Sequence, residues 1–389
     1  MALTNRQTAP RIAGLEVNSL LAAGVLPPSR FQETRLSASP TPIHDLNGEL
    51  LFYRVPILRG RVTDSYADVA AFPVFGGLLL RVATGLSWDE KALLKAAETA
   101  ARKQKRSLKF DKTRFVAYSY PKVAVQFLLG DEEVAMLELG SWTQVPPARQ
   151  RKADEPPSNF DRWSVIDEFP PLRQRESEKV LTERLRQWEE LKISIDPRTI
   201  DATAYLRAVD AILAVRTETR QIAYSPIPGD HVPCFELRGQ RTNVWCVAAS
   251  VQMILDFYRY NYDQTRLATE LGLGTLSNPN GLPYTDDNKV VTTLETMTAN
   301  ALDASMNTSP SWTQFRDEIR ANRPLISFVP GHSRAVAGYT ATRTLLWNTF
   351  RGLLVYDPWP PADGVITQWE NFDATTYRRT FSAQVTLVP

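Results

Sequence analysis

The sequence predicts an α+β protein in two parts, with strands and helices in separate runs instead of strict alternation. Strand-forming segments surround one helix over about 41–146, and one helix precedes a run of strands over 231–389. A stretch rich in proline and charge separates these two parts. A chain of 389 residues is also longer than one small hydrophobic core usually supports, so two domains are the default expectation.

Residues 1–40 contain four prolines among mixed polar residues, and we expect them to form an extended N-terminal arm. A small α+β domain over 41–146 follows. Its helix is predicted to begin after Ser87, because Ser87 and Glu90 have the spacing of a capping box, and to end near Lys103. Its strands are predicted at 50–55, 66–75, 77–82, 115–120, 123–129 and 134–139.

Residues 147–230 have the composition of a linker that carries two helices. Prolines and charged residues dominate its first part. An amphipathic helix is predicted over 176–193, and a second helix over 199–215. The turn-forming run 224–230 then marks a second boundary.

The third segment, 231–389, begins with a helix and continues mainly as strands. Apolar residues recur at helical spacing over 246–258, which predicts a helix packed against a core. Residues 272–288 are rich in Gly, Asn and Pro and are expected to form loops. A further helix is predicted over 310–322 with Ser311 as its cap, and strands at 324–329, 332–341, 352–356 and 381–387.

Composition limits the classes of partner and compartment. A formal net charge of +2 is nearly neutral, so we expect neither a nucleic-acid partner nor a membrane partner. No apolar run approaches the roughly 20 residues of a membrane helix, and the first residues lack a secretory signal pattern. Cys234 and Cys246 alone cannot form a disulfide framework. The expected compartment is therefore the cytoplasm, with export by a non-classical route left open.

Cys246 is the candidate nucleophile. It lies at the first turn of the predicted helix 246–258, where the positive end of the helix dipole favours a thiolate. The alternative is a structural cysteine in the core, since cysteine is among the most buried residue types.

His332 and Asp357 are the candidate base and its orienting acid. The chain has three histidines, of which His44 lies in the other domain and His231 near a predicted linker, although the sequence leaves His231 open. His332 begins one predicted strand and Asp357 ends the next. A hairpin centred near Thr344 and Leu345 would place them opposite each other, where the carboxylate can fix the imidazole tautomer. The alternatives are a structural histidine and an ordinary Asp-Pro turn.

Gln240 completes the set, six residues before the cysteine. Its side-chain amide can donate to a developing oxyanion together with the Cys246 backbone N–H. The alternative is a glutamine in a polar surface turn. The cysteines and histidines show no metal-ligand spacing, so neither a metal site nor any cofactor is expected.

These residues also carry a resemblance to a known family. The segments around Gln240, Trp245-Cys246-Val247-Ala248-Ala249, Gly331-His332 and Tyr356-Asp357-Pro358-Trp359 resemble the active-site segments of bacterial C39-like, papain-fold cysteine peptidases. The resemblance covers about 230–389. It implies a papain-like domain in which a helix bears the cysteine and an antiparallel sheet bears the histidine and aspartate. It implies catalytic roles for Cys246, His332, Asp357 and Gln240. Val247 departs from the aromatic residue often found after the cysteine.

The N-terminal half resembles, in segments 45–53 and 118–122, the propeptide-like domains that precede some bacterial peptidases. This resemblance implies an inhibitory or chaperone module that packs on the catalytic domain in cis. It also implies a zymogen that a cut between Thr219 and Pro233 would activate.

The expected function is a cysteine peptidase that hydrolyses a protein or peptide substrate through an acyl-enzyme. Two alternatives stay open. One is acyl transfer of the transglutaminase or deamidase type, because fold and triad do not fix the acceptor. The other is a protein-binding module without activity. The sequence does not predict the substrate or the oligomeric state.

Overall fold

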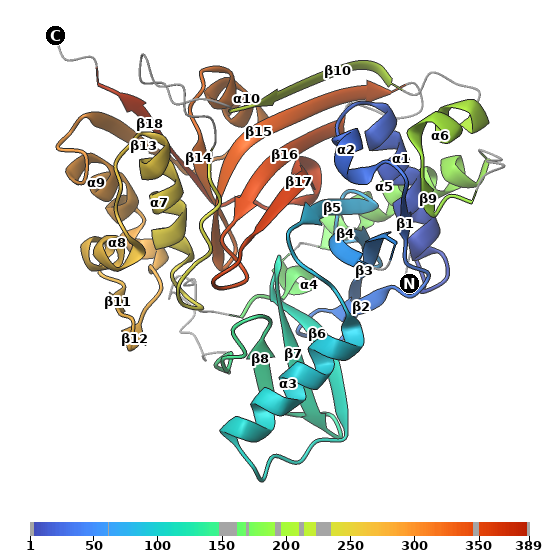
Figure 1. Cartoon of the computed structure of the whole chain (residues 1–389), viewed down its shortest axis with the longest axis horizontal. Helices are drawn as coiled ribbons and strands as arrows, with labels where there is room; N and C mark the ends of the chain where they lie inside the picture. Colours follow the sequence, from blue (N-terminus) through green and yellow to red (C-terminus); the bar gives the residue numbers. More distant parts are fainter. Residues whose placement is uncertain are drawn as a thin grey trace.

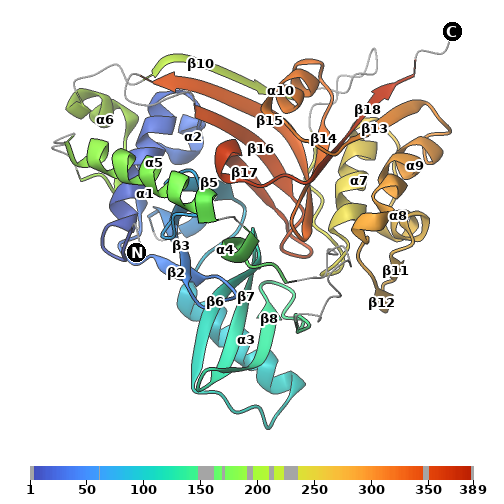
Figure 2. The ribbon, with the colours of Figure 1, turned by 180° about the vertical axis from the view of Figure 1, so that it is seen from behind.

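The computed structural model describes residues 4–60, 62–147, 162–168, 171–190, 196–209, 214–222, 235–344 and 350–386. Helices and mainly antiparallel strands alternate in runs, so the expected mixed α+β content is confirmed. Figures 1 and 2 show the strands β14 to β17 at the centre, with helical groups on either side of them. None of the described helices is long and apolar enough to cross a membrane.

The first part of the chain supplies two helical groups and a meander of strands. Its elements are α1 (Ala9–Ala22), α2 (Pro28–Phe31), β1 (Thr34–Leu36), β2 (Thr41–His44), β3 (Leu50–Arg59), β4 (Val62–Ala70), β5 (Leu79–Thr84), α3 (Glu90–Gln104), β6 (Lys112–Ser119), β7 (Lys122–Leu129) and β8 (Glu132–Glu138).

The middle and last parts follow in the same order as the sequence indicated, with more elements. The middle part holds α4 (Val165–Glu168), α5 (Pro171–Glu190), β9 (Thr199–Ile200), α6 (Ala202–Val209) and β10 (Ala214–Gln221). The last part holds α7 (Cys246–Phe257), α8 (Gln264–Leu271), β11 (Gly274–Thr275), β12 (Asn278–Pro279), η1 (Tyr284–Asp286), α9 (Asn288–Thr296), β13 (Leu302–Asn307), α10 (Trp312–Arg320), β14 (Leu325–Val329), β15 (His332–Thr344), β16 (Phe350–Asp357), β17 (Val365–Asn371), η2 (Phe372–Ala374) and β18 (Arg379–Val385).

One hydrogen-bonded sheet runs through both halves of the chain. Its main path among the described strands is β13-β18-β14-β15-β16-β17-β5-β4-β3-β2-β6-β7-β8, and β1, β9 and β10 attach beside it. The junction is the antiparallel pairing of β17 with β5, in which Glu370 lies opposite Arg81. The two halves therefore share backbone hydrogen bonds in addition to side-chain contacts.

Two tryptophans of the last part are buried in the cores of the first. Trp369 of β17 belongs to the cluster formed by α1, α5 and strands β3 to β5. Trp359 belongs to the cluster formed around α3, β2, β6 and β7. Both side chains are 0% exposed, so the N-terminal elements bury part of the core of the C-terminal half.

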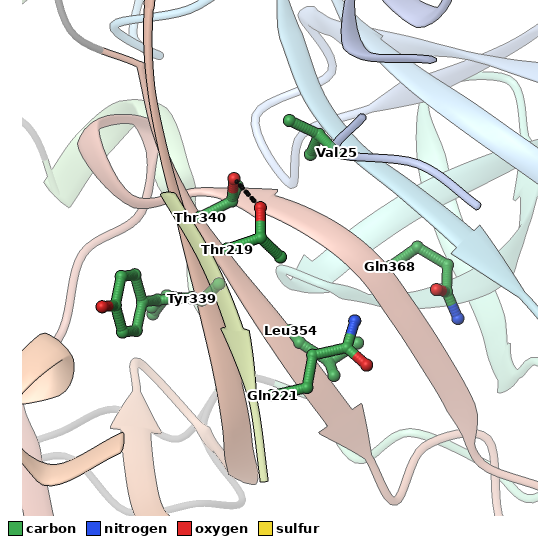
Figure 3. A pocket seen from close by; sticks show the side chains of 8 residues that line it. Val25, Thr219, Gln221, Tyr339, Thr340, Leu354 and Gln368 are labelled. Atoms are coloured by element: carbon green, nitrogen blue, oxygen red, sulfur yellow. Dashed lines mark hydrogen bonds between the residues drawn. The ribbon is translucent and has the colours of Figure 1, made fainter. Parts of the chain in front are cut away.

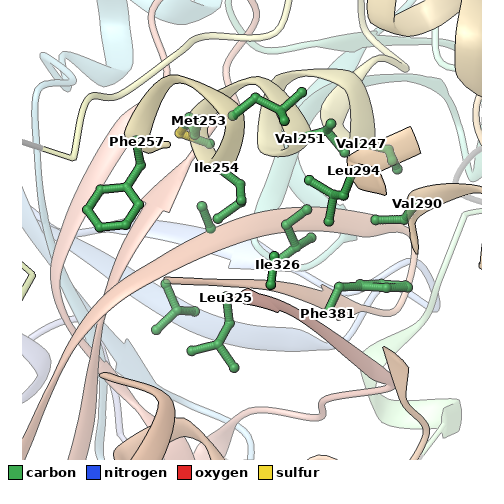
Figure 4. Packing of buried hydrophobic residues seen from close by; sticks show 14 of the residues in the cluster. Val247, Val251, Met253, Ile254, Phe257, Val290, Leu294, Leu325, Ile326 and Phe381 are labelled. Carbon is green, nitrogen blue, oxygen red and sulfur yellow. The ribbon is translucent and has the colours of Figure 1, made fainter. Parts of the chain in front are cut away.

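The core of the last part lies between α7 and the strands β14, β15 and β18. Residues Val247, Val251, Ile254 and Phe257 form the buried face of α7 (Figure 4). Ile326 of β14 and its partner Phe381 of β18 pack on the side of the sheet that faces α7, whereas Leu325 points to the other side. The helical spacing seen in the sequence produces this apolar face, and it fixes α7 over β15, the strand that begins at His332.

Three local predictions are corrected. The expected extended arm over 1–40 is wrong for 9–22, which form α1 because this segment is buried between α6 and the strands β3, β4 and β5. The helix expected to 215 ends at Val209, and β10 follows because Ala214–Gln221 pairs with β15. The cap of α3 is Asp89 instead of Ser87, since the Asp89 carboxylate accepts the Ala92 N–H at 3.1 Å. The expected Ser311 cap is confirmed.

Candidate active site

Cys246 is the first residue of α7. The preceding Trp245 is 0% exposed, and its indole N–H donates to the Leu273 carbonyl at 3.0 Å, which anchors the start of the helix. The small residues Ala248 and Ala249 follow, both fully buried. The Cys246 sulfur accepts the backbone N–H of Ser333, so the thiol lies against the first residues of β15.

A tight turn places His332 at the start of β15. Val329 pairs with His332, which leaves Pro330 and Gly331 as the two turn residues. Gly331 has φ 66°, a left-handed value that glycine adopts without strain. The Ser333 hydroxyl donates to Ser250 of α7 at 3.0 Å, which fixes this end of the strand to the helix.

Asp357 lies at the end of β16 and contacts the imidazole directly. Nε2 of His332 donates to Oδ1 of Asp357 at 2.6 Å. The same oxygen accepts the backbone N–H of Trp359 at 3.0 Å. The strands do not pair 332 with 357, because Ala335 lies opposite Tyr356 and a bulge follows at Val336 and Gly338. The contact is diagonal across the hairpin instead of directly opposed.

This hydrogen bond fixes the histidine tautomer. An ionised carboxylate can only accept, so Nε2 carries the proton and Nδ1 presents a lone pair. Nδ1 has no hydrogen-bond partner among the described residues. The imidazole is therefore oriented as a base whose accepting nitrogen is available.

Gln240 lies beside the segment that follows Asp357. Its backbone N–H donates to the Pro358 carbonyl at 2.9 Å, and its own carbonyl accepts from Ala362. The side-chain Nε2 donates to the Thr242 carbonyl at 2.8 Å, and no hydrogen bond between the Gln240 side chain and Cys246 is present among the described contacts. An amide nitrogen has two protons, so Nε2 retains one donor for a further acceptor.

Burial dominates the electrostatics of the site. It raises the pKa of the Cys246 thiol, against the opposing effects of the Lys122 ammonium and the Ser333 N–H. It lowers the pKa of His332, although Asp357 acts in the opposite direction. Burial alone would raise the pKa of Asp357, but His332, Arg334 and Arg81 together hold it below its usual range. The closed site therefore favours a neutral thiol and a neutral imidazole.

The hairpin of β6 and β7 closes over this site from the N-terminal half. At its tip, the Ser119 hydroxyl donates a hydrogen bond to the Pro330 carbonyl at 2.8 Å. A Cβ on Gly331 would lie 2.2 Å from the Ser119 oxygen, so the approach of the hairpin also requires glycine there. Lys122, the first residue of β7, is 4% exposed and its charge acts on both Cys246 and Asp357.

A second contact comes from β8. The indole N–H of Trp359 donates to Glu138 at 3.1 Å, and Tyr118 donates to the same carboxylate at 2.6 Å. The four candidate residues are consequently covered: Cys246 is 2% exposed, Asp357 1%, and His332 and Gln240 0%.

A small pocket lies elsewhere on the sheet (Figure 3). Thr219 and Gln221 of β10 line it together with Thr340, Leu354 and Gln368, and Thr219 contacts Thr340 through a 2.9 Å hydroxyl pair. None of the four candidate residues lines this pocket.

The other residues that the sequence left open lie outside this cluster or outside the described residues. His44 lies in β2, where its ring nitrogen is 3.4 Å from the Phe115 carbonyl. His231 and Cys234 fall in 223–234, outside the described residues.

Sequence reasoning missed the charged residues that the N-terminal half contributes. Lys122 and Arg81 each lie in an apolar strand, within Lys122-Val123-Ala124-Val125 and Leu79-Leu80-Arg81-Val82. A charge in an otherwise apolar strand is uncommon unless it is paired, and this signal could have selected both. Their position beside Cys246 and Asp357 depends on tertiary contacts.

Comparison with known proteins agrees with the resemblance in the sequence. Residues 232–385 match the Peptidase_C39 like family, which supports a peptidase of the cysteine type in general. Among solved structures, the chain is similar to a double glycine motif protease from an AMS/PCAT transporter in complex with the leader peptide. The identity is 14% and the TM-score 0.26, and the match covers 39% of this chain and 94% of that chain. No curated protein matches the chain.

Proposed function

We propose that the chain is a cysteine peptidase that hydrolyses peptide bonds of a protein or peptide through Cys246, His332 and Asp357. One observation carries this proposal. The 2.6 Å hydrogen bond from His332 Nε2 to Asp357 leaves Nδ1 without a partner among the described residues. The next residue of the strand, Ser333, donates its backbone N–H to the Cys246 sulfur. A thiol, an oriented base and its carboxylate partner are the groups that acyl transfer requires.

The reaction proceeds through a thioester. His332 Nδ1 takes the thiol proton, and the sulfur attacks the carbonyl carbon of the peptide bond. The imidazolium then protonates the leaving amine as the carbon–nitrogen bond breaks. His332 next removes a proton from water, the hydroxide attacks the thioester, and the carboxylic acid leaves as the thiol is restored.

The oxyanion is stabilised by donors at the start of α7. The backbone N–H of Cys246 belongs to the unpaired N–H groups of a helix start, and the remaining Nε2 proton of Gln240 is the second donor. The backbone of Gln240 is fixed to the carbonyl of Pro358, so this donor keeps a constant relation to the catalytic aspartate.

The resting form is latent, because the β6–β7 hairpin covers the nucleophile. The contact of Ser119 at its tip and that of Glu138 on the neighbouring strand β8 bury groups that a substrate must reach. This location supports the part of the sequence-based proposal that assigns an inhibitory role to the N-terminal half. Turnover requires the hairpin tip to move away from Pro330.

A peptidyl electrophile that reacts with cysteine peptidases tests the assignment. We expect mass spectrometry to find one adduct on Cys246 in the wild-type chain and none in Cys246→Ala. The matched control, Cys234→Ser, should be labelled like the wild type. Cys246→Ala and His332→Ala should each remove turnover of an unlabelled peptide almost completely. Asp357→Asn should lose roughly one to two orders of magnitude less.

Two results would overturn the proposal. Equal labelling of wild type and Cys246→Ala would indicate a binding module without this nucleophile. Rapid incorporation of an added amine into a glutamine-donor peptide, with negligible hydrolysis, would indicate acyl transfer to amines instead.

A further inference from the structure

The second carboxylate oxygen of Asp357 faces the N-terminal half. Oδ1 is occupied by His332 and by the Trp359 N–H. Oδ2 has no hydrogen-bond partner among the described residues, and the Arg81 Nη1 lies 3.9 Å away. An ionised carboxylate without solvent needs a compensating charge, so the cation nearest to Oδ2 matters for its ionisation.

Among the described residues, the Arg81 guanidinium forms a hydrogen bond through one of its edges only. Nε donates to Asp68 at 2.9 Å, whereas Nη1 and Nη2 have no hydrogen-bond partner among the described residues. Asp68 also accepts two 2.8 Å bonds from Arg54, so its position does not depend on Arg81 alone. The free edge of the Arg81 guanidinium therefore adjoins the Asp357 carboxylate.

The sheet fixes the relation between these two side chains. Arg81 pairs with Glu370 across the β5–β17 junction, and Asp357 pairs with Val365 at the other end of β17. Both residues are therefore held by strands that pair with β17. Arg81 and Asp357 can stay together when the tip of the β6–β7 hairpin moves.

The buried positive and negative side chains around the triad are equal in number only when those of both halves of the chain are included. Arg334 pairs with Glu370 inside the C-terminal half, which leaves Asp357 as an extra negative charge there. Arg54 and Arg81 against Asp68 leave one extra positive charge in the N-terminal half. Lys122 and Glu138, both buried in the N-terminal half, add one cationic and one anionic group. Four basic side chains thus face four carboxylates, and His332 is not required to be charged for neutrality.

We propose that Arg81 is a positioning residue of the triad, which neutralises Asp357 from the N-terminal half so that His332 remains an unprotonated base. This inference rests on the proposed function and deepens it. The active enzyme keeps the body of its N-terminal half, including β5, and opens only at the β6–β7 hairpin. Removing the whole N-terminal half would remove a part of the active site.

The charged and titratable groups that face Asp357 come from five elements. His332 and Arg334 belong to β15, Arg81 to β5, Lys122 to β7, Tyr66 to β4 and Cys246 to α7. Loss of the Arg81 charge leaves Asp357 with Arg334 as the remaining arginine that offsets its negative charge, so the carboxylate acts more strongly on the His332 imidazole. This effect favours protonated His332.

The test is a titration of histidine in the full chain. Because the chain has three histidines, selective ¹⁵N labelling gives few imidazole signals. The signal that is lost in His332→Gln is the signal of His332. We expect Arg81→Met to move the His332 titration to higher pH. Arg54→Met is the matched control, because it removes an equally buried guanidinium from Asp68 but not one beside Asp357. It should change the unfolding midpoint without moving the His332 titration.

Activity supplies a second readout. We expect Arg81→Met to slow labelling of Cys246 by the peptidyl probe about tenfold, the change that one pKa unit of differential interaction represents. Arg81→Lys should restore most of the pH profile because it keeps the charge. In an Asp357→Asn background, Arg81→Met should have little further effect on the rate, since its partner charge is gone.

The outcomes separate the two proposals. An unchanged His332 titration in Arg81→Met, or an equal shift in Arg54→Met, would overturn the role of Arg81. If Arg81→Met does not fold, an unshifted titration in Arg81→Gln would overturn it equally. A shift in His332 together with absent peptidase activity in every form would retain the role of Arg81 and remove the proposed function.

Discussion

At the scale of single residues, burial determines the protonation state of the Cys246 thiol. The thiol is 2% exposed and its pKa is raised chiefly by burial, so the resting protein holds it as the protonated form. We expect alkylation by a small electrophile, measured in a Cys234→Ser background, to rise with pH only above the usual thiol range. A midpoint at or below that range in the closed protein would contradict this assignment.

His332 and Asp357 make the stability of the fold depend on pH. Both have a pKa lowered in the folded chain, from 6.5 and 3.8 respectively. The unfolded chain therefore binds protons first on acidification, and stability falls as the pH drops below about 6.5. The loss through His332 is about 1.4 kcal/mol for each pKa unit of lowering, and Asp357 adds its share below 3.8.

Urea unfolding at a series of pH values measures this dependence. His332→Gln should flatten the decline below 6.5, because it removes the group that titrates there. His44 has a pKa lowered in the same direction, mainly by burial, so His44→Gln determines its separate share. A wild-type decline that persists unchanged in His332→Gln would exclude the buried imidazole as its source.

We infer that the β6–β7 hairpin is the element that controls access to the site. Ser119 at its tip bonds to the Pro330 carbonyl and contacts Gly331, whereas Lys112 lies exposed at its other end. We expect Ser119→Glu to displace the tip, since a carboxylate cannot donate to that carbonyl and the longer side chain has no room against Gly331. Labelling of Cys246 by the peptidyl probe should rise at least roughly tenfold, an increase that corresponds to about 1.4 kcal/mol in the closed-to-open equilibrium.

Lys112→Glu is the control for this hairpin. It places the same carboxylate on β6, with an even larger change in net charge, at the end of the strand remote from Ser119, so labelling should match the wild type. In Ser119→Glu, the pH midpoint of alkylation should also move down, because exposure to solvent removes the burial that raises the thiol pKa. Equal labelling of both variants and wild type would show that the hairpin does not limit access.

The sheet junction joins the two halves at the scale of the whole molecule. β17 pairs with β5, and Trp369 and Trp359 are buried in cores made by N-terminal elements. We expect a chain cut at a protease site inserted within 223–233 to remain one particle in gel filtration. Its rate of Cys246 labelling should equal that of the uncut chain, because neither the hairpin nor Arg81 has moved.

This outcome distinguishes two forms of regulation. Activation by release of the N-terminal half, as the propeptide resemblance implied, requires the cut halves to separate and the C-terminal piece to gain activity. Retention of both halves with unchanged labelling supports regulation at the hairpin alone. Separation of the cut halves into an active C-terminal fragment would contradict the role proposed for Arg81.

The sequence by itself determined the candidate residues and the element on which each lies. Cys246 begins a helix because apolar residues recur every three or four positions after it, and His332 begins a strand after a Pro-Gly turn. These are local effects of side-chain periodicity and backbone geometry. They also predicted the Ser311 cap and the mixed α+β content, which the structure confirms.

Only the tertiary structure decided how those elements meet. The hairpin pairs Ala335 with Tyr356, so that His332 reaches Asp357 diagonally, and the sequence contains no signal that fixes this register. The contacts of Lys122, Ser119 and Arg81 with the site join residues more than 120 positions apart. Such contacts depend on packing between distant segments, which local propensity does not encode.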